Sequence, residues 1–202
     1  MQFEKSALQF LKELQKNNNR EWFNEHKKDF KNHQTHVKNF FEALREKLEL
    51  HDEIEKNKIF RIYRDVRFSK DKTPYNPRFA GSFSRLGKHL RGGYFLQIKP
   101  GESVLGGGFW EPNKEDIFRL RKEIELDASE FREILSDSTY VKHFGGVFEG
   151  EELKSAPRGF AKDHKAIDLI KKKQYIFTKK YTDKEVLDAN FLSEIDSAFK
   201  AI

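Results

Sequence analysis

The sequence of 202 residues contains no cysteine, one methionine, two tryptophans and five prolines. Without cysteine the chain has no disulfide, no thiol nucleophile and no cysteine-based zinc site. No apolar run is long enough to span a bilayer, and the first residues lack the basic region and apolar core of a secretory signal. We therefore expect a cytoplasmic protein that does not insert into a membrane.

Hydrophobic residues are also scarce, at 37% of the chain, while charged residues make up 36%. Such a composition borders on that of disordered proteins, but the 20 phenylalanines argue against disorder because disordered chains are poor in aromatic residues. The chain is long enough to bury a core unaided. Because it has no repeat, linker or low-complexity tract, we expect one domain over residues 1–202.

Positive charge is concentrated in one part of the chain. The net charge is +6, and residues 61–91 contain nine Lys or Arg but only two Asp, so the remainder is close to neutral. A local basic patch indicates a surface that faces an anion, whereas evenly spread basicity would indicate only a contribution to solubility.

The most patterned stretch is residues 60–78, with the sequence FRIYRDVRFSKDKTPYNPR. Alternate residues from Phe60 to Phe68 are mostly apolar, and the residues between them are mostly polar. A helix is the competing interpretation, but β-branched and aromatic residues at period two favour a strand. Arg64 falls among the core-facing positions, so we expect it to be paired internally. Pro74 then ends the strand in a turn.

The rest of the chain predicts an α+β fold, with a mainly antiparallel sheet packed by a long N-terminal helix and by C-terminal helices. Apolar spacing and caps predict helices over residues 6–16, 20–50, 113–126, 128–135, 163–170 and 182–199, with a possible break at 32–35. Alternation and turn residues predict strands over 79–86, 94–99, 103–110 and 174–179, and a small hairpin over 147–153. The glycines at 106–108 indicate a bulge or a close backbone approach.

The main candidate site is a cluster of six cations in the patterned stretch: Arg61, Arg64, Arg67, Lys70, Lys72 and Arg78. Guanidinium groups offer rigid donors that match carboxylate or phosphate oxygens. Asp65 and Asp71 would orient the cations, and Tyr75 would line the site. An internal ion network is the alternative, but two acids cannot neutralise six cations, so some charge must face water or a ligand.

A second candidate is the loop that contains Arg158 and His164, whose course Pro157 and Gly159 would fix. If this loop folds against the basic turn, Arg158 would line the anion site and His164 would serve as a general acid or base. The alternative is that Asp163 caps a helix and His164 sits in its first turn.

Other signals for metals and cofactors are weak. Three histidines, His26, His33 and His36, lie in the long predicted helix without a His-Glu-x-x-His pattern. The glycines at 106–108 lack both the ending of a P-loop and the spacing of a dinucleotide fingerprint. We therefore expect neither a metal nor a cofactor.

Several stretches together resemble one family. They are FLKEL at 10–14, NNREWF at 18–23, FRIYRDVRFSKDKTPY at 60–75, GGG at 106–108, and PRGF at 157–160 with Asp163 and His164. This ordered set resembles the uncharacterised, largely bacterial family called domain of unknown function 2461. The resemblance covers nearly the whole chain and implies a soluble single-domain protein. It implies no activity, ligand or catalytic residue.

The leading hypothesis is a protein that binds a phosphate- or carboxylate-bearing ligand at the basic strand and turn. One alternative is an enzyme acting on a phosphorylated substrate, with His164 or Asp71 as the proton carrier. Another is nucleic-acid binding, because aromatic residues such as Tyr63 and Phe68 interleave with the cations. A third is an interaction module with no ligand, whose basic face meets an acidic partner.

Overall fold

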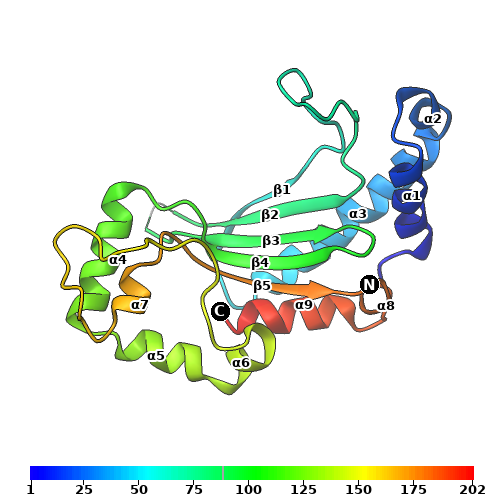
Figure 1. The fold of residues 1–202 in the computed structure, drawn as a ribbon. Helices are drawn as coiled ribbons and strands as arrows, with labels where there is room; N and C mark the ends of the chain where they lie inside the picture. Colours follow the sequence, from blue (N-terminus) through cyan, green and yellow to red (C-terminus); the bar gives the residue numbers. More distant parts are fainter. Residues whose placement is uncertain (88) are drawn as a thin grey trace.

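The computed structural model describes residues 1–87 and 89–202, which form a five-stranded sheet flanked by helices (Figure 1). The strands are β1 (Ile54–Ile59), β2 (Phe79–Arg85), β3 (Gly93–Ile98), β4 (Ser103–Phe109) and β5 (Tyr175–Tyr181). Each strand pairs antiparallel with the next, in the order β1-β2-β3-β4-β5. The prediction of an α+β fold with a mainly antiparallel sheet is confirmed.

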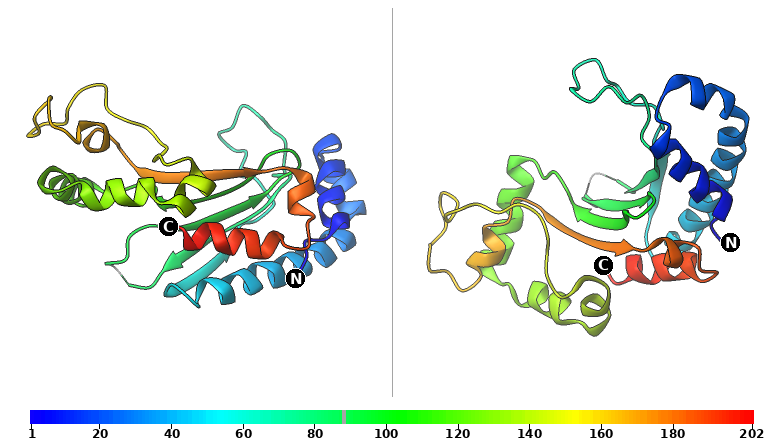
Figure 2. Two further views of the ribbon diagram at one scale, coloured as in Figure 1. Left: turned by 90° about the horizontal axis from the view of Figure 1, so that it is seen from below. Right: turned by 45° about the vertical axis from the view of Figure 1, so that its right-hand side comes forward.

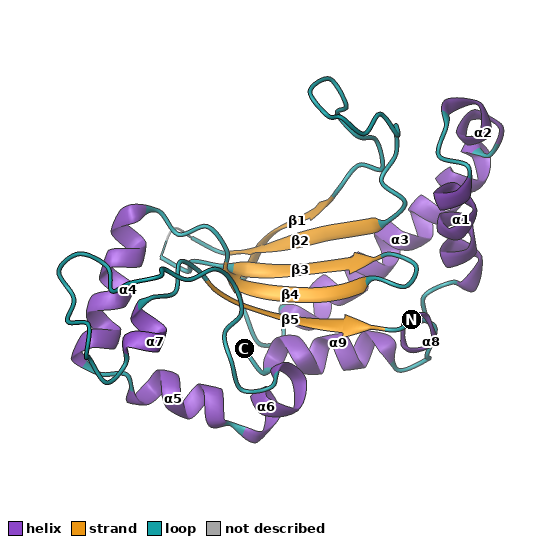
Figure 3. Ribbon diagram, in the orientation of Figure 1, coloured by secondary structure: helices purple, strands orange, loops and turns teal. Residues whose placement is uncertain are grey.

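Helices precede and follow the sheet and also fill the long connection between β4 and β5 (Figure 3). The chain begins with α1 (Lys5–Lys16), α2 (Arg20–Glu25) and α3 (Lys27–Leu48). The β4–β5 connection holds α4 (Lys114–Leu126), α5 (Ser129–Ser136), α6 (Ser138–Phe144) and α7 (Ile167–Ile170). The chain ends with α8 (Asp183–Val186) and α9 (Phe191–Lys200). None of these helices combines the length and the apolar character that crossing a membrane requires.

Side-chain caps mark the starts of four helices, α2, α4, α6 and α8. The Thr182 hydroxyl and the Glu185 carboxylate form the expected capping box at the start of α8. The predicted helix over residues 20–50 is interrupted at His26, earlier than the break considered at 32–35. The Trp22 carbonyl oxygen accepts from both the backbone N–H of His26 at 3.1 Å and His26 Nδ1 at 2.8 Å at this interruption. The predicted helix over 182–199 is likewise divided into α8 and α9.

The two faces of the sheet differ (Figure 2). One face packs on α3 and α9: Phe83 stacks on Phe41 with ring centroids 5.9 Å apart, and Tyr94 meets Phe199 edge-on at 4.9 Å. Burying one phenylalanine contributes roughly 1.5–3 kcal/mol, so this interface supplies much of the hydrophobic stabilisation. Across the opposite face, no helix of residues 1–87 and 89–202 covers the central strands, and Ser84 there is exposed.

The glycines at 106–108 mark a close approach rather than a bulge. Pairing of β4 with β5 runs without a register shift from Ser103 to Phe109. A Cβ on Gly107 would lie 2.7 Å from the Phe177 ring, and Gly108 has a φ of +102°. Only glycine fits both positions without strain. The sheet therefore needs these glycines for packing between β4 and β5.

A second, smaller core lies beside the sheet, among α4, α5, α7 and the start of β5. Two predictions in this region are wrong. Residues 147–153 form no hairpin of their own, because Glu149 and Glu152 make bridges to Ile176 and Lys172. No helix begins at Asp163 either; α7 begins at Ile167, and its N-cap residue makes no side-chain cap.

Candidate functional site

Residues 60–78 form an excursion between β1 and β2 that stands out from the sheet, and we call it the basic arm (Figure 1). The prediction of a strand over residues 60–68 is wrong. The arm has a short paired base, where Asn76 N–H donates to the Ile62 carbonyl oxygen at 2.7 Å and Arg64 N–H to that of Pro74 at 2.9 Å. Beyond this base the chain is irregular, and Phe68, expected in the core, is 97% exposed.

The base of the arm is fixed to the helices at the start of the chain. Ile62 and Tyr75 are buried, and the Tyr75 ring stacks on Phe23 of α2 with centroids 4.0 Å apart. The Asn18 side chain holds the backbone of Tyr75 on both sides, donating to its carbonyl oxygen at 2.9 Å and accepting from its N–H at 3.1 Å. Tyr75 therefore anchors the arm to α2, with its ring turned into the core.

Arg64 holds the tip of the arm together. Its guanidinium donates to the Asp71 carboxylate at 2.5 Å and to the carbonyl oxygen of Thr73 at 3.0 Å, and it also contacts the Thr73 hydroxyl. The backbone N–H and hydroxyl of Thr73, followed by Arg64, lower the pKa of Asp71 to about 2. Asp71 is thus an ionised structural partner and a weak base near neutral pH.

Asp65 is engaged in the same way by Arg67, whose guanidinium donates to it at 2.6 Å and 3.0 Å. This hydrogen bond lowers the pKa of Asp65. The pair is exposed, so it contributes little to stability. Because Arg64 and Arg67 engage both aspartates of the arm, neither carboxylate balances another cation there.

The remaining four cations of the arm have no acidic partner among the described residues. Lys72 donates to the carbonyl oxygen of Val66 at 3.0 Å, and Arg78 donates to the side-chain oxygen of Gln97 on β3. Arg61 and Lys70 are exposed. The arm therefore carries four positive charges that no carboxylate of the described chain balances.

The structure does not bring Arg158 and His164 to the arm. Their loop lies beside α4 and α7, at the opposite end of the sheet from the arm (Figure 1). Phe160 anchors it by meeting Phe118 of α4 edge-on, with ring centroids 6.0 Å apart. His164 Nδ1 accepts from the Ala166 N–H at 3.1 Å, so it supports the turn before α7.

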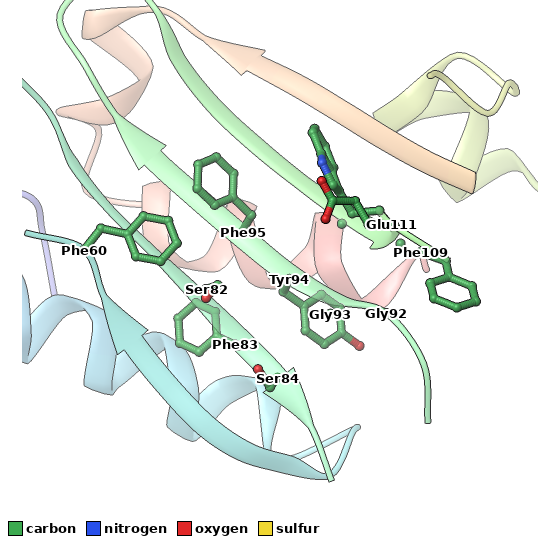
Figure 4. Close-up of a pocket in the computed structure, with 13 residues that line it drawn as sticks. Phe60, Ser82, Phe83, Ser84, Gly92, Gly93, Tyr94, Phe95, Phe109 and Glu111 are labelled. Carbon is green, nitrogen blue, oxygen red and sulfur yellow. The ribbon is translucent and has the colours of Figure 1, made fainter. Parts of the chain in front are cut away.

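A groove of about 500 Å³ lies on the uncovered face of the sheet (Figure 4). Its floor consists of small residues on adjacent strands, and aromatic side chains line it, among them Phe60, Phe95 and Trp110. Phe60 is the first residue of the arm, so the groove begins where the arm leaves the sheet.

Comparison with known proteins identifies the family of this chain. Residues 6–202 match the model of a family described as "Conserved hypothetical protein (DUF2461)". The chain belongs to the DUF2461 family. The match confirms the resemblance seen in the sequence and spans the arm and the groove alike. No curated protein and no solved structure matches the chain. The family description names no reaction, so the chemistry must come from the residues.

The groove of this DUF2461 member was not predicted from its sequence, although a signal was present. The pairing of β1 to β4 puts alternate residues on one face, and at the groove these are small or aromatic residues bordered by lysines: Ser82, Ser84, Gly93, Phe95 and Gly108, with Lys56 and Lys58. A comparison of the two faces across the predicted strands would have indicated an uncovered face.

No metal site is evident in the part of the chain that the structure describes: among residues 1–87 and 89–202, no three His, Asp or Glu side chains converge.

One further cluster in this DUF2461 member superficially resembles a catalytic triad. Ser197 Oγ lies 3.3 Å from Nε2 of His143, which is buried, and Lys179 Nζ lies 2.9 Å from His143 Nδ1 and 2.5 Å from Glu194. An ammonium group can only donate, so Nδ1 accepts and Nε2 carries the hydrogen. His143 therefore donates to Ser197 and does not activate it as a nucleophile.

The same cluster predicts a pH dependence of stability. Burial, reinforced by the charge of Lys179, lowers the pKa of His143 below its ordinary value of 6.5. As the pH falls below about 6.5, the unfolded chain takes up a proton that folded His143 refuses, so the free energy of unfolding decreases. Urea denaturation at several pH values should show this loss in the wild type and a smaller one in His143→Gln. His89→Gln, at an exposed histidine, is the control, and an unchanged pH profile in His143→Gln would contradict the assignment.

Proposed function

We propose that this DUF2461 protein binds a phosphate- or carboxylate-bearing ligand through the basic arm. The observation that carries the proposal is the unbalanced charge of the arm. Arg64 and Arg67 are each paired with an aspartate, whereas the other cations have no acidic partner among the described residues: Arg61, Lys70, Lys72 and Arg78.

Like charges held close together on one exposed segment repel each other, and an anion relieves that repulsion. Phosphate and carboxylate oxygens also accept charge-assisted hydrogen bonds from guanidinium and ammonium groups, which are stronger than neutral ones. The arm is suited to this role because its base is fixed to α2 and its tip is braced by Arg64. A braced tip loses less conformational entropy on binding than a free loop would.

The enzyme alternative required a pocket that joins the arm to the loop of Arg158 and His164. That loop lies at the other end of the sheet, and His164 is engaged with the backbone of Ala166. Asp71, the other candidate proton carrier, is held in its ionised form. These observations favour binding over catalysis at the arm.

Inorganic tripolyphosphate provides a direct test, with calorimetric titration at low salt as the measurement. Arg61→Glu/Lys70→Glu/Lys72→Glu, the reversed-arm variant, should lose at least about 100-fold in affinity, because each charge-assisted hydrogen bond contributes about 1.5–3 kcal/mol. The matched control is Lys38→Glu/Lys142→Glu/Lys200→Glu, which makes the same charge change at exposed lysines of α3, α6 and α9.

The control variant should bind tripolyphosphate within about 3-fold of the wild type, since screened charges far from the arm contribute little. Circular dichroism of both variants verifies the fold. Equal weakening in the two triple variants would show a non-specific effect of net charge and would overturn the assignment to the arm. The absence of binding in the wild type would overturn the proposal itself.

A further inference from the structure

The floor of the groove is unusual for a sheet face. Ser82 and Ser84 of β2 pair with Phe95 and Gly93 of β3, and Gly93 pairs in turn with Gly108 of β4. Glycine and serine leave the backbone of three adjacent strands accessible from the uncovered side. A flat molecule can therefore lie against this floor, which large side chains would prevent.

Aromatic rings stand around this floor: Phe60 and Phe95 are half-buried, and Trp110 is exposed. The Phe60 and Phe95 rings lie 6.1 Å apart with 32° between their planes, and Figure 4 shows them side by side, Phe95 on β3 and Phe60 just after β1. Trp110, at the end of β4, is 54% exposed. None of the three belongs to either core cluster of the described residues, so packing of the fold does not account for them.

Cations border the aromatic rings on the β1 side. Lys58 Nζ lies 5.7 Å from the centroid of the Phe60 ring, and Lys56 and Lys58 share the groove face because they pair with Ser84 and Ser82. Neither lysine forms an ion pair within the described residues. Arg78, which donates to Gln97 on β3, extends this positive border into the arm.

We propose that the groove binds single-stranded nucleic acid, with bases stacked on Phe60, Phe95 and Trp110 and phosphates on the cations of β1 and the arm. This inference rests on the proposed function and names its ligand. Aromatic platforms beside a basic track are how proteins hold single strands, because every base has a π-face and every linkage a phosphate. A duplex hides its base faces and would not stack.

Charge selects this occupant over others. An apolar small molecule or a second copy of the sheet face would gain nothing from Lys56, Lys58 and Arg61, whereas a phosphodiester chain satisfies them. Glu111 at the rim is the one acid of the groove lining, and its carboxylate can accept from a base N–H. The volume of about 500 Å³ lies in the range of sites for flat ring systems.

The test uses a fluorescein-labelled single-stranded RNA of mixed sequence and about 12 nucleotides, with fluorescence anisotropy as the readout. This length lies within the roughly 4 to 16 nucleotides that one single-strand-binding domain covers. Phe60→Ala and Phe95→Ala should each weaken binding by about 5- to 100-fold. Phe95→Tyr and Trp110→Phe keep an aromatic ring and should stay within about 3-fold of the wild type. Phe118→Ala, which removes an exposed ring of α4 outside the groove, is the control and should leave the affinity for the RNA unchanged.

Tripolyphosphate separates this inference from the proposed function. The Phe60→Ala and Phe95→Ala variants should keep wild-type affinity for it, because it has no ring to stack. RNA binding that is unchanged in these variants, or equal affinity for a duplex of the same sequence, would overturn stacking in the groove and leave the arm proposal intact. Self-association that the same variants abolish, without RNA binding, would identify a second copy as the occupant. If the wild type binds neither the RNA nor tripolyphosphate, both proposals are overturned.

Discussion

Replacing Gly108 by alanine is expected to destabilise the fold by at least about 3–4 kcal/mol, among the largest effects a single substitution produces. Gly108 has a φ of +102°, and a Cβ there would lie 2.2 Å from the Tyr175 carbonyl oxygen. The residue cannot relax without breaking the pairing of β4 with β5, because the opposing atom belongs to the backbone. The measurement is the free energy of unfolding from urea denaturation.

Gly106 provides the matched control for this prediction. It lies on the same strand with an ordinary φ, and a Cβ there would come no closer than 3.4 Å to its neighbours. Gly106→Ala should therefore change the free energy of unfolding by less than about 1 kcal/mol. Similar losses in the two variants would show that the glycines serve general strand flexibility and not a specific close approach.

Replacing Asp52 by alanine is the second large expected effect, at about 3–5 kcal/mol of destabilisation. The Asp52 side chain is 9% exposed, receives the Tyr94 hydroxyl at 2.6 Å, and lies 2.7 Å from Arg85 Nε. Burial alone would raise its pKa, but the hydrogen bonds from Arg85 and Tyr94 hold that pKa below the ordinary value. Its removal would leave a guanidinium and a hydroxyl without their partner.

The Asp52 prediction is checked by thermal and urea unfolding, with Tyr94→Phe as the companion variant. Tyr94→Phe removes one donor and leaves the ion pair intact, so it should cost only about 0.5–1.5 kcal/mol. A loss in Asp52→Ala no larger than that in Tyr94→Phe would contradict a buried network around the carboxylate.

The sequence was sufficient where local chemistry determines structure. The capping box of Thr182 and Glu185, and the alternation along β2, β3 and β4, led directly to elements that the structure contains. β1 was not predicted because the four residues between its two isoleucines in IEKNKI are polar and show no alternation, as suits a lysine-bearing strand at a sheet edge. Alternation also misled over residues 60–68, where bonds from the side chains of Arg64 and Asp71 replace the ladder of a strand.

The candidate site was only partly accessible to sequence reasoning. Concentrated charge led to the arm, and the count of two acids against six cations correctly indicated that pairing would be incomplete. The separation of His164 from the arm depends on the course of the long β4–β5 connection, which no local pattern encodes. The groove could not be predicted in the same way, because its lining residues come together only through the register of β1, β2, β3 and β4.

Salt dependence of tripolyphosphate binding tests the central claim most directly, because it reports on positive charge that is open to solvent. Between about 0.05 and 0.3 M NaCl, the affinities of the wild type and the matched triple lysine control should fall steeply and in parallel, since counterions compete for exposed cations. The reversed-arm variant should stay at least about 100-fold weaker than the wild type at the lowest salt concentration. Binding by that variant equal to the wild type, or a wild-type affinity that salt leaves unchanged, would contradict an anion site on the arm.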